Sequence, residues 1–179
     1  MMFSPAGSRA GVATPAGGCG WRPAASPSGS LRARLRVKAM RQLYDRWRKL
    51  QKRGALPPLR RFDPGHRAGL EWLFTVTVDR TVDPALFRVA HVGEALASRL
   101  GRPLDGEPVG LIGAELPGSQ EAAYRRCART CGPCYEHARF ALGDGQPVAF
   151  ERLLLPFSDN GRDVTHLLGM AVFTDLAPN

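Results

Sequence analysis

Acidic residues are almost absent from the first third of this chain. Residues 1–61 carry 14 lysines and arginines but only one acid, Asp45, whereas residues 62–179 carry 11 basic and 15 acidic residues. The net charge of +9 therefore belongs to the N-terminal third. A mildly acidic body argues against nucleic-acid binding across its surface, so we expect no nucleic-acid partner. The alternative is that residues 1–61 form an RNA- or membrane-binding arm.

Long apolar runs and catalytic motifs are also missing. No stretch approaches the roughly 18 apolar residues that a membrane helix needs. A phosphate-binding loop, H-E-x-x-H and G-x-S-x-G are absent. Four cysteines without a preceding secretory hydrophobic segment are typical of a reducing compartment. We expect a cytoplasmic protein without enzymatic activity and without a membrane span.

The first 30 residues have the composition of a disordered tail. Gly, Ala, Pro and Ser supply 21 of them, which leaves too little apolar surface to offset the entropy of ordering the segment. The alternative is that translation begins at Met40 and that the tail is an over-extended gene start.

A basic amphipathic helix is predicted over residues 31–54, with Gly54 at its end. Its apolar residues recur every three or four positions and are flanked by arginines and lysines, so they form one stripe. This stripe needs a surface to cover it: the chain's own domain, a second copy of the helix in a homodimer, or an anionic membrane. The stripe consists of Met40, Leu43, Tyr44, Trp47 and Leu50.

Two strands are predicted after residue 62. "DPGHRAGL" is typical of a short helical turn capped by Asp63. Alternating apolar residues then predict strands in "EWLFTVTVD" and "ALFRVAHV", the second with Phe87, Val89 and His91 on one face. The short connection between them suits an antiparallel pair.

Helices and three further strands complete the pattern. "GEALASRLG" predicts a short helix, and "SQEAAYRRCARTCG" a longer one with Ser119 as its N-cap. Strands are predicted in "CYEHARFAL", "PVAFERLLLPFSD" and "DVTHLLGMAVFTDL", joined by the turn-forming stretches "GDGQP" and "SDNGRD". The order is two strands, short helices, a longer helix and a three-stranded meander.

This order of elements and three sequence segments resemble those of a bacterial family of small, stand-alone PAS-domain proteins. The stretches are "LYDRWRKLQKRGALPPLRRFDP", "FRVAHVGEALASRLGRPLDG" and "FERLLLPFSDNGRDVTHLLGMAVF". The resemblance implies an α+β fold over residues 62–176: a PAS-like five-stranded antiparallel sheet with helices on one face. It implies a pocket or a partner surface, and it does not imply enzymatic activity.

The stretch "CARTCGPCYEH" raises the alternative of a metal or redox site. Cys127, Cys131, Cys134 and His137 are suitable ligands for zinc or an iron–sulfur cluster. However, Cys134 and His137 are an odd number of residues apart on a predicted strand, so they point to opposite faces. A thioredoxin-like C-G-P-C pair is disfavoured because a helix runs into the motif instead of starting from it. Ordinary buried cysteines at the end of a helix fit the pattern best.

We predict a non-catalytic PAS sensory module that binds a small ligand or a signalling partner, acts in trans and forms a homodimer. The alternative is a cysteine-based metal-binding or redox-switch protein. We expect no cofactor; zinc, iron–sulfur and haem are the alternatives. The predicted pocket between the inner sheet face and the helices is apolar. Its candidate residues are Phe74, Val76, Phe87, Val89, Leu96, Leu100, Leu111, Leu116, Tyr124 and Leu168.

Overall fold

The computed structural model describes residues 30–51, 55–65, 69–111, 120–141 and 147–175. Nearly all of the tail predicted to be disordered therefore lies outside the described residues. The strands are β1 (Leu73–Asp79), β2 (Leu86–Val92), β3 (Cys134–Ala141), β4 (Pro147–Phe157) and β5 (His166–Asp175). The helices are α1 (Leu31–Arg34), α2 (Lys38–Leu50), α3 (Glu94–Leu100) and α4 (Gln120–Thr130), and the 3-10 turns are η1 (Leu59–Arg61), η2 (Leu70–Trp72) and η3 (Val109–Leu111).

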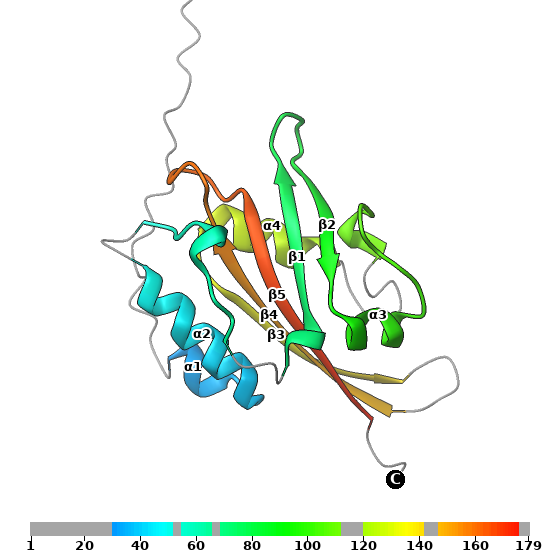
Figure 1. Ribbon diagram of the computed structural model, residues 1–179. Coiled ribbons are helices and arrows are strands. Elements are labelled where there is room, and N and C mark those ends of the chain that lie inside the picture. Colours follow the sequence, from blue (N-terminus) through cyan, green and yellow to red (C-terminus); the bar gives the residue numbers. More distant parts are fainter. Residues whose placement is uncertain (1–29, 52–54, 66–68, 112–119, 142–146, 176–179) are drawn as a thin grey trace, which may run out of the picture.

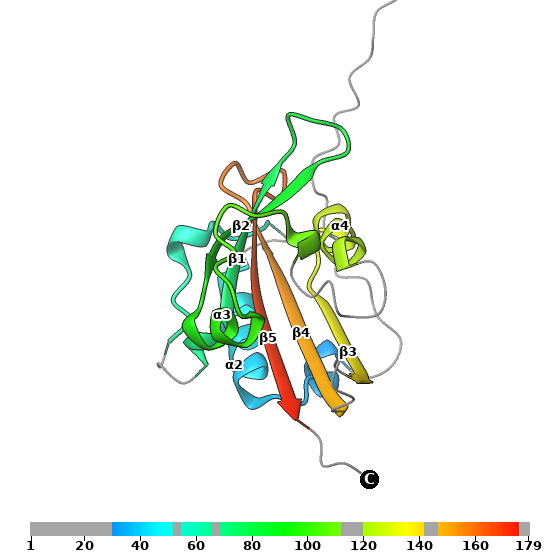
Figure 2. The same ribbon diagram turned by 90° about the vertical axis from the view of Figure 1, so that its right-hand side faces the viewer.

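The five strands form one antiparallel sheet in the order β2-β1-β5-β4-β3. Helices α1 and α2 lie in front of the sheet in Figure 1, and α4 lies behind it. Figure 2, turned by 90°, shows α2 and α4 on opposite sides of the strands. We call the two sides the α2 face and the α4 face. The predicted α+β fold with a five-stranded antiparallel sheet is confirmed.

Helix α2 packs its apolar stripe against the sheet of its own chain. Every predicted stripe residue is buried except Leu50, which is half-buried. The indole N–H of Trp47 donates a 2.9 Å hydrogen bond to the backbone carbonyl of Pro156 in β4. Of the three surfaces that could cover the stripe, the structure shows the first, the chain's own domain.

The structure has two helices where the sequence predicts one. The chain leaves the helical conformation at Leu35, whose side chain is only 1% exposed and belongs to the core. The guanidinium of Arg41 donates to the carbonyls of Leu35 (2.7 Å) and Arg36 (3.0 Å). These bonds satisfy two of the carbonyls that the interruption leaves without helical partners. The predicted end of the helix at residues 52–54 lies outside the described residues.

The predicted helical turn at Asp63 is not present in its described part. Residues 63–65 are irregular, and the Asp63 carboxylate accepts a hydrogen bond from the backbone N–H of Gly65 (2.7 Å). This is the local side-chain-to-backbone bond by which Asp stabilises turns as well as helix caps. Residues 66–68 lie outside the described residues.

A β-bulge changes the predicted facing of His91. Val76 pairs with Val89, but the next pairing joins Thr75 to His91, so one residue of β2 is left without a partner. Directly paired residues point to the same face of a sheet. His91 therefore lies on the α2 face, opposite to Val89, and it is exposed. The prediction that His91 shares a face with Phe87 and Val89 is wrong because the bulge interrupts the period of two.

The turn between β4 and β5 is organised by Asn160. Its carboxamide oxygen accepts the backbone N–H groups of Arg162 (2.8 Å) and Asp163 (2.9 Å) and the hydroxyl of Ser158 (3.0 Å). Gly161 follows with φ +72°, a conformation that favours glycine. These contacts explain why the stretch "SDNG" follows the strand.

Candidate functional site

Six of the ten predicted pocket residues are buried in the core, and two of them pack against Tyr124 of α4. The rings of Phe74 in β1 and Phe87 in β2 each lie 6.3 Å, centroid to centroid, from the ring of Tyr124 in α4. Such aromatic pairs add specific packing energy to the burial of their apolar area. The six residues, none more than 4% exposed, are Phe74, Val76, Phe87, Val89, Leu96 and Tyr124.

The other four candidates have different positions. Leu100 is half-buried at the end of α3. The Leu111 side chain and the whole of Leu116 lie outside the described residues. Leu168 pairs directly with Thr75, the neighbour of Phe74, and so it lies on the α2 face. The structure does not bring Leu168 together with the cluster below α4.

An arginine that the sequence analysis did not single out lies beside this cluster. Arg152 of β4 is only 1% exposed and pairs with Ala171, two residues from Gly169, which faces Phe74. Its position on the strand therefore places it on the α4 face.

Three groups surround the Arg152 guanidinium. It forms an ion pair with Glu136 of β3, and its Nη1 donates to the Tyr124 hydroxyl at 3.2 Å. It also lies 4.8 Å from the ring centroid of Tyr124 and 5.6 Å from that of Phe150. Among the described residues, the Arg152 Nε–H is buried without an acceptor.

A buried charge is retained only where its partners compensate for lost hydration. Glu136 supplies the opposite charge, but the Nε–H still lacks the acceptor that nearly all buried polar groups have. Burial raises the pKa of Tyr124, so its hydroxyl stays protonated near neutral pH. The Arg152 Nε–H is therefore an unused donor beside apolar side chains. In the sequence, Arg152 could have been noticed as a single arginine within the largely apolar stretch "FERLLLPF".

The cysteine stretch forms the junction between α4 and β3. Cys127 and Cys134 are buried free cysteines, and Cys131 is buried with φ 53°. His137 lies on the α2 face, where its Nε2 is 2.9 Å from Arg36 Nη1, whereas Cys134 pairs with Leu154 on the α4 face. In the described part of the chain, no three His, Cys, Asp or Glu side chains are arranged to hold a metal ion.

The two free cysteines differ in acidity. A hydrogen bond from the Cys127 thiol, together with the nearby guanidinium of Arg126, lowers the pKa of Cys134 to about 6. Burial raises the pKa of Cys127 well above its usual range.

A family model for the PAS domain matches residues 35–172, which is most of the chain. The chain belongs to the PAS domain family. PAS domains are sensory and signalling modules, and they are generally not catalytic. No curated protein matches the chain.

No helix within the described residues is long and apolar enough to cross a membrane.

Solved PAS and light-oxygen-voltage domains resemble this PAS chain at low identity. The PAS domain of BvgS from Bordetella pertussis is 14% identical, with a TM-score of 0.44, over 62% of this chain and 81% of that one. The light-oxygen-voltage domain of the EL346 histidine kinase from Erythrobacter litoralis is 19% identical, with a TM-score of 0.39, over 58% and 97%. An RNA-binding light-oxygen-voltage receptor is 21% identical, with a TM-score of 0.41, over 59% of this chain but only 30% of the receptor.

Proposed function

We propose that this chain is a non-catalytic sensory module that binds a small ligand on the α4 face of its sheet. The observation that carries this proposal is the buried Arg152 Nε–H, which lacks an acceptor among the described residues. Phe74, Phe87 and Tyr124 supply apolar surface nearby. Sites for small molecules combine such walls with a few placed polar groups. The ligand is therefore apolar in most of its surface and carries a carbonyl or carboxylate oxygen.

The signal passes to a separate protein in trans. Support comes from the PAS match over residues 35–172, since PAS domains are sensory and signalling modules. We further propose a homodimer as the signalling unit. Because the α2 stripe is buried within the chain, such a dimer uses a different surface, and light scattering on the purified protein measures the assembly.

Ligand binding is tested by releasing small molecules from purified protein and identifying them by mass spectrometry. We expect the wild type to release an oxygen-bearing compound that the double variant Arg152→Met/Glu136→Gln has lost. Both charges are removed together because a single buried charge without its partner destabilises the fold. Circular dichroism controls for folding. Equal amounts of compound from the wild type and a folded double variant would exclude Arg152 as the anchor.

The proposed module works without a metal or a coloured cofactor. An absorption spectrum from 300 to 700 nm and a metal analysis, both on anaerobically purified protein, test this proposal. A resident cofactor would be present at about one per chain. A Soret band, a flavin spectrum, an iron–sulfur band or stoichiometric zinc would contradict it. A blank spectrum would support a colourless ligand.

A further inference from the structure

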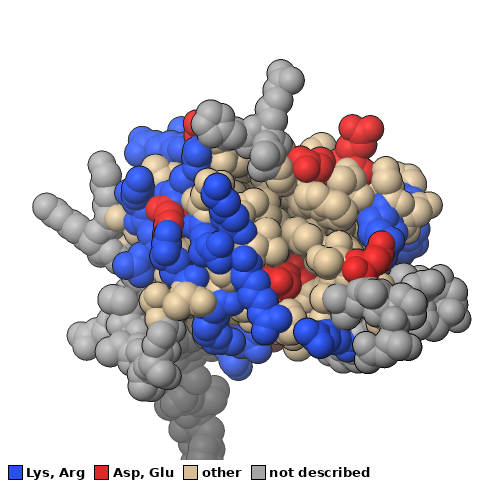
Figure 3. Space-filling model, turned by 90° about the horizontal axis from the view of Figure 1, so that it is seen from below, with Lys and Arg blue, Asp and Glu red and all other residues tan. Residues whose placement is uncertain are grey.

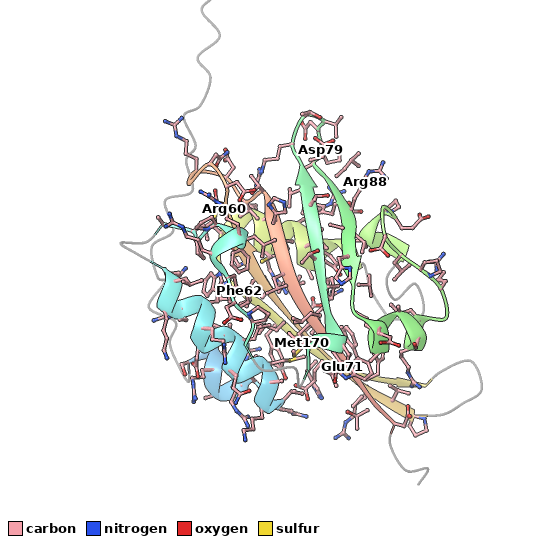
Figure 4. All side chains as sticks on the ribbon, viewed as in Figure 1. Arg60, Phe62, Glu71, Asp79, Arg88 and Met170 are labelled. Carbon is pink, nitrogen blue, oxygen red and sulfur yellow. The ribbon has the colours of Figure 1, made fainter. Side chains whose placement is uncertain are left out.

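A cavity lies on the side of the sheet opposite to Arg152, between α2 and the start of β1. Its volume is about 490 Å³, which is within the range of small-molecule sites. Figure 4 shows two of its lining residues, Glu71 and Met170, near each other at the start of β1. Because it lies on the α2 face, this cavity is separate from the Arg152 cluster and its ligand proposal.

The inner walls of this cavity are apolar. Leu73, Met170 and Val172 form its floor on β1 and β5. Leu43 of α2 and Trp72 of η2 add to opposite sides. Among the described lining residues, no buried side-chain donor lacks an acceptor as the Arg152 Nε–H does. The interior therefore suits a hydrocarbon chain or ring.

Gly69 closes the cavity where η2 meets α2 and β5. Its φ is +98°, and an added Cβ would lie 3.2 Å from both the Ala39 Cβ and the Met170 Cε. The backbone therefore packs directly against both walls at this point. Its N–H donates to the Glu71 carboxylate at 3.0 Å, so this donor is already used.

The mouth of the cavity is basic along one side. Lys38, Gln42 and Arg46 are spaced four residues apart and so lie along one edge of α2. The Arg46 guanidinium lies where Gly65 lacks a side chain, since a Cβ on Gly65 would be 2.0 Å from it. Glu71 lines the opposite side. The lining therefore holds two basic residues and one acid, and the Arg46 guanidinium also donates to the Asp63 carbonyl at 3.5 Å.

The wider surface around this mouth is also basic. Figure 3 shows Lys and Arg side chains gathered on the side of the molecule where α1 and α2 lie. The exposed residues Arg34, Lys38, Arg48 and Lys49 belong to these helices. A surface with this charge concentrates small anions near the opening.

We propose that this cavity binds an amphipathic monocarboxylate, with its chain or ring on the apolar floor and its carboxylate at Lys38 and Arg46. A highly charged ligand such as a nucleotide fits poorly, since the interior is apolar and the Gly69 N–H is occupied. The carboxylate of the bound ligand then contacts α2, and its apolar part contacts the sheet. Ligand binding therefore holds α2 on the sheet.

The test titrates octanoate, below its micelle concentration, into the full-length protein by calorimetry. We expect saturable binding of one molecule per chain, with octan-1-ol bound about tenfold more weakly because it lacks the charge. Saturable octanoate binding that octan-1-ol matches would overturn the role of Lys38 and Arg46. Absence of saturable binding would overturn the site.

Variants locate the bound octanoate. Ala39→Phe fills the cavity from α2 and should abolish binding, and Val172→Phe does the same from β5 if the first variant fails to fold. Lys38→Ala/Arg46→Ala should weaken binding about tenfold. The control Arg48→Ala/Lys49→Ala makes the same charge change on α2 outside the cavity lining and should leave the affinity unchanged. An equal loss in the control would show that only the general field attracts the anion.

Photochemical labelling distinguishes this cavity from the ligand site proposed at Arg152. A diazirine analogue of octanoate should label peptides that contain Leu43, Trp72 or Met170. Labelling confined to peptides containing Tyr124 or Arg152 would overturn the proposal and place the ligand on the α4 face instead.

Discussion

Gly93 connects β2 to α3 at a point where no side chain fits. An added Cβ would lie 2.5 Å from the backbone carbonyl oxygen of Glu71, and the Gly93 N–H donates to the Leu73 carbonyl at 2.7 Å. Backbone atoms on both sides leave no flexible group to move. The glycine that follows the strand in "HVG" is therefore fixed by a close approach of two chain segments.

We predict that Gly93→Ala lowers the free energy of unfolding by about 1–3 kcal/mol, the usual cost of overpacking. Gly110→Ala is the matched control, because an added Cβ there meets nothing within 4 Å. Urea unfolding followed by circular dichroism measures both. Equal stability of the two variants would mean that the chain near Glu71 can move aside.

The acidity of Cys134 gives a second prediction at the residue scale. Since its pKa is lowered to about 6, we predict that Cys134 is a thiolate at pH 7 and becomes a thiol as the pH falls below about 6. Absorbance at 240 nm should therefore show a thiolate titration near this pH in the wild type. Cys134→Ser should lose the transition, and Arg126→Ala should shift it upward. A first transition near the ordinary pKa of a cysteine, 9.0, would contradict this prediction.

At the scale of elements, α2 contributes to the core of the domain. Trp47 is fully buried and hydrogen-bonded to the Pro156 carbonyl. We therefore predict that Trp47→Ala lowers the free energy of unfolding by about 3–5 kcal/mol. Trp47→Phe keeps most of the volume and should cost about 1 kcal/mol for the lost hydrogen bond. Arg48→Ala, the exposed neighbour, should change little. Light scattering reports the assembly: a folded, equally stable Trp47→Ala with an altered oligomeric state would assign the stripe to a partner.

The strands and helices were largely predictable because their patterns are local. The strand "LFTVTVD" alternates from Phe74 onward, and α3 is followed by Gly101 in the left-handed conformation, with φ +70°. The break at Leu35 was not predictable, since the segment contains no glycine or proline and its cause is the burial of one leucine in the core. The bulge that turns His91 outward likewise depends on its pairing with β1.

At the scale of the whole molecule, one core cluster includes buried residues from both faces of the sheet. We therefore predict that amides of Leu43 to Trp47 exchange hydrogen about as slowly as those of β4 and β5. Exchange of all these amides then requires global unfolding. Hydrogen exchange read by mass spectrometry measures the rates. Much faster exchange in α2 than in β4 would show that the helix detaches separately, and octanoate should then slow it.

The sequence by itself determined the order of the elements, the apolar stripe of α2 and the apolar residues that are buried beside Tyr124. These depend on periodicity and on turn residues, which act within a few positions along the chain. Tertiary structure alone decided which surface covers the stripe, which face Leu168 and His91 take, and that Arg152 meets Glu136 and Tyr124. The basic mouth of the cavity beside α2 also arises only when α2 is packed beside β1 and β5. The physical reason is that pairing and packing join residues distant in sequence, and no local pattern specifies the partner.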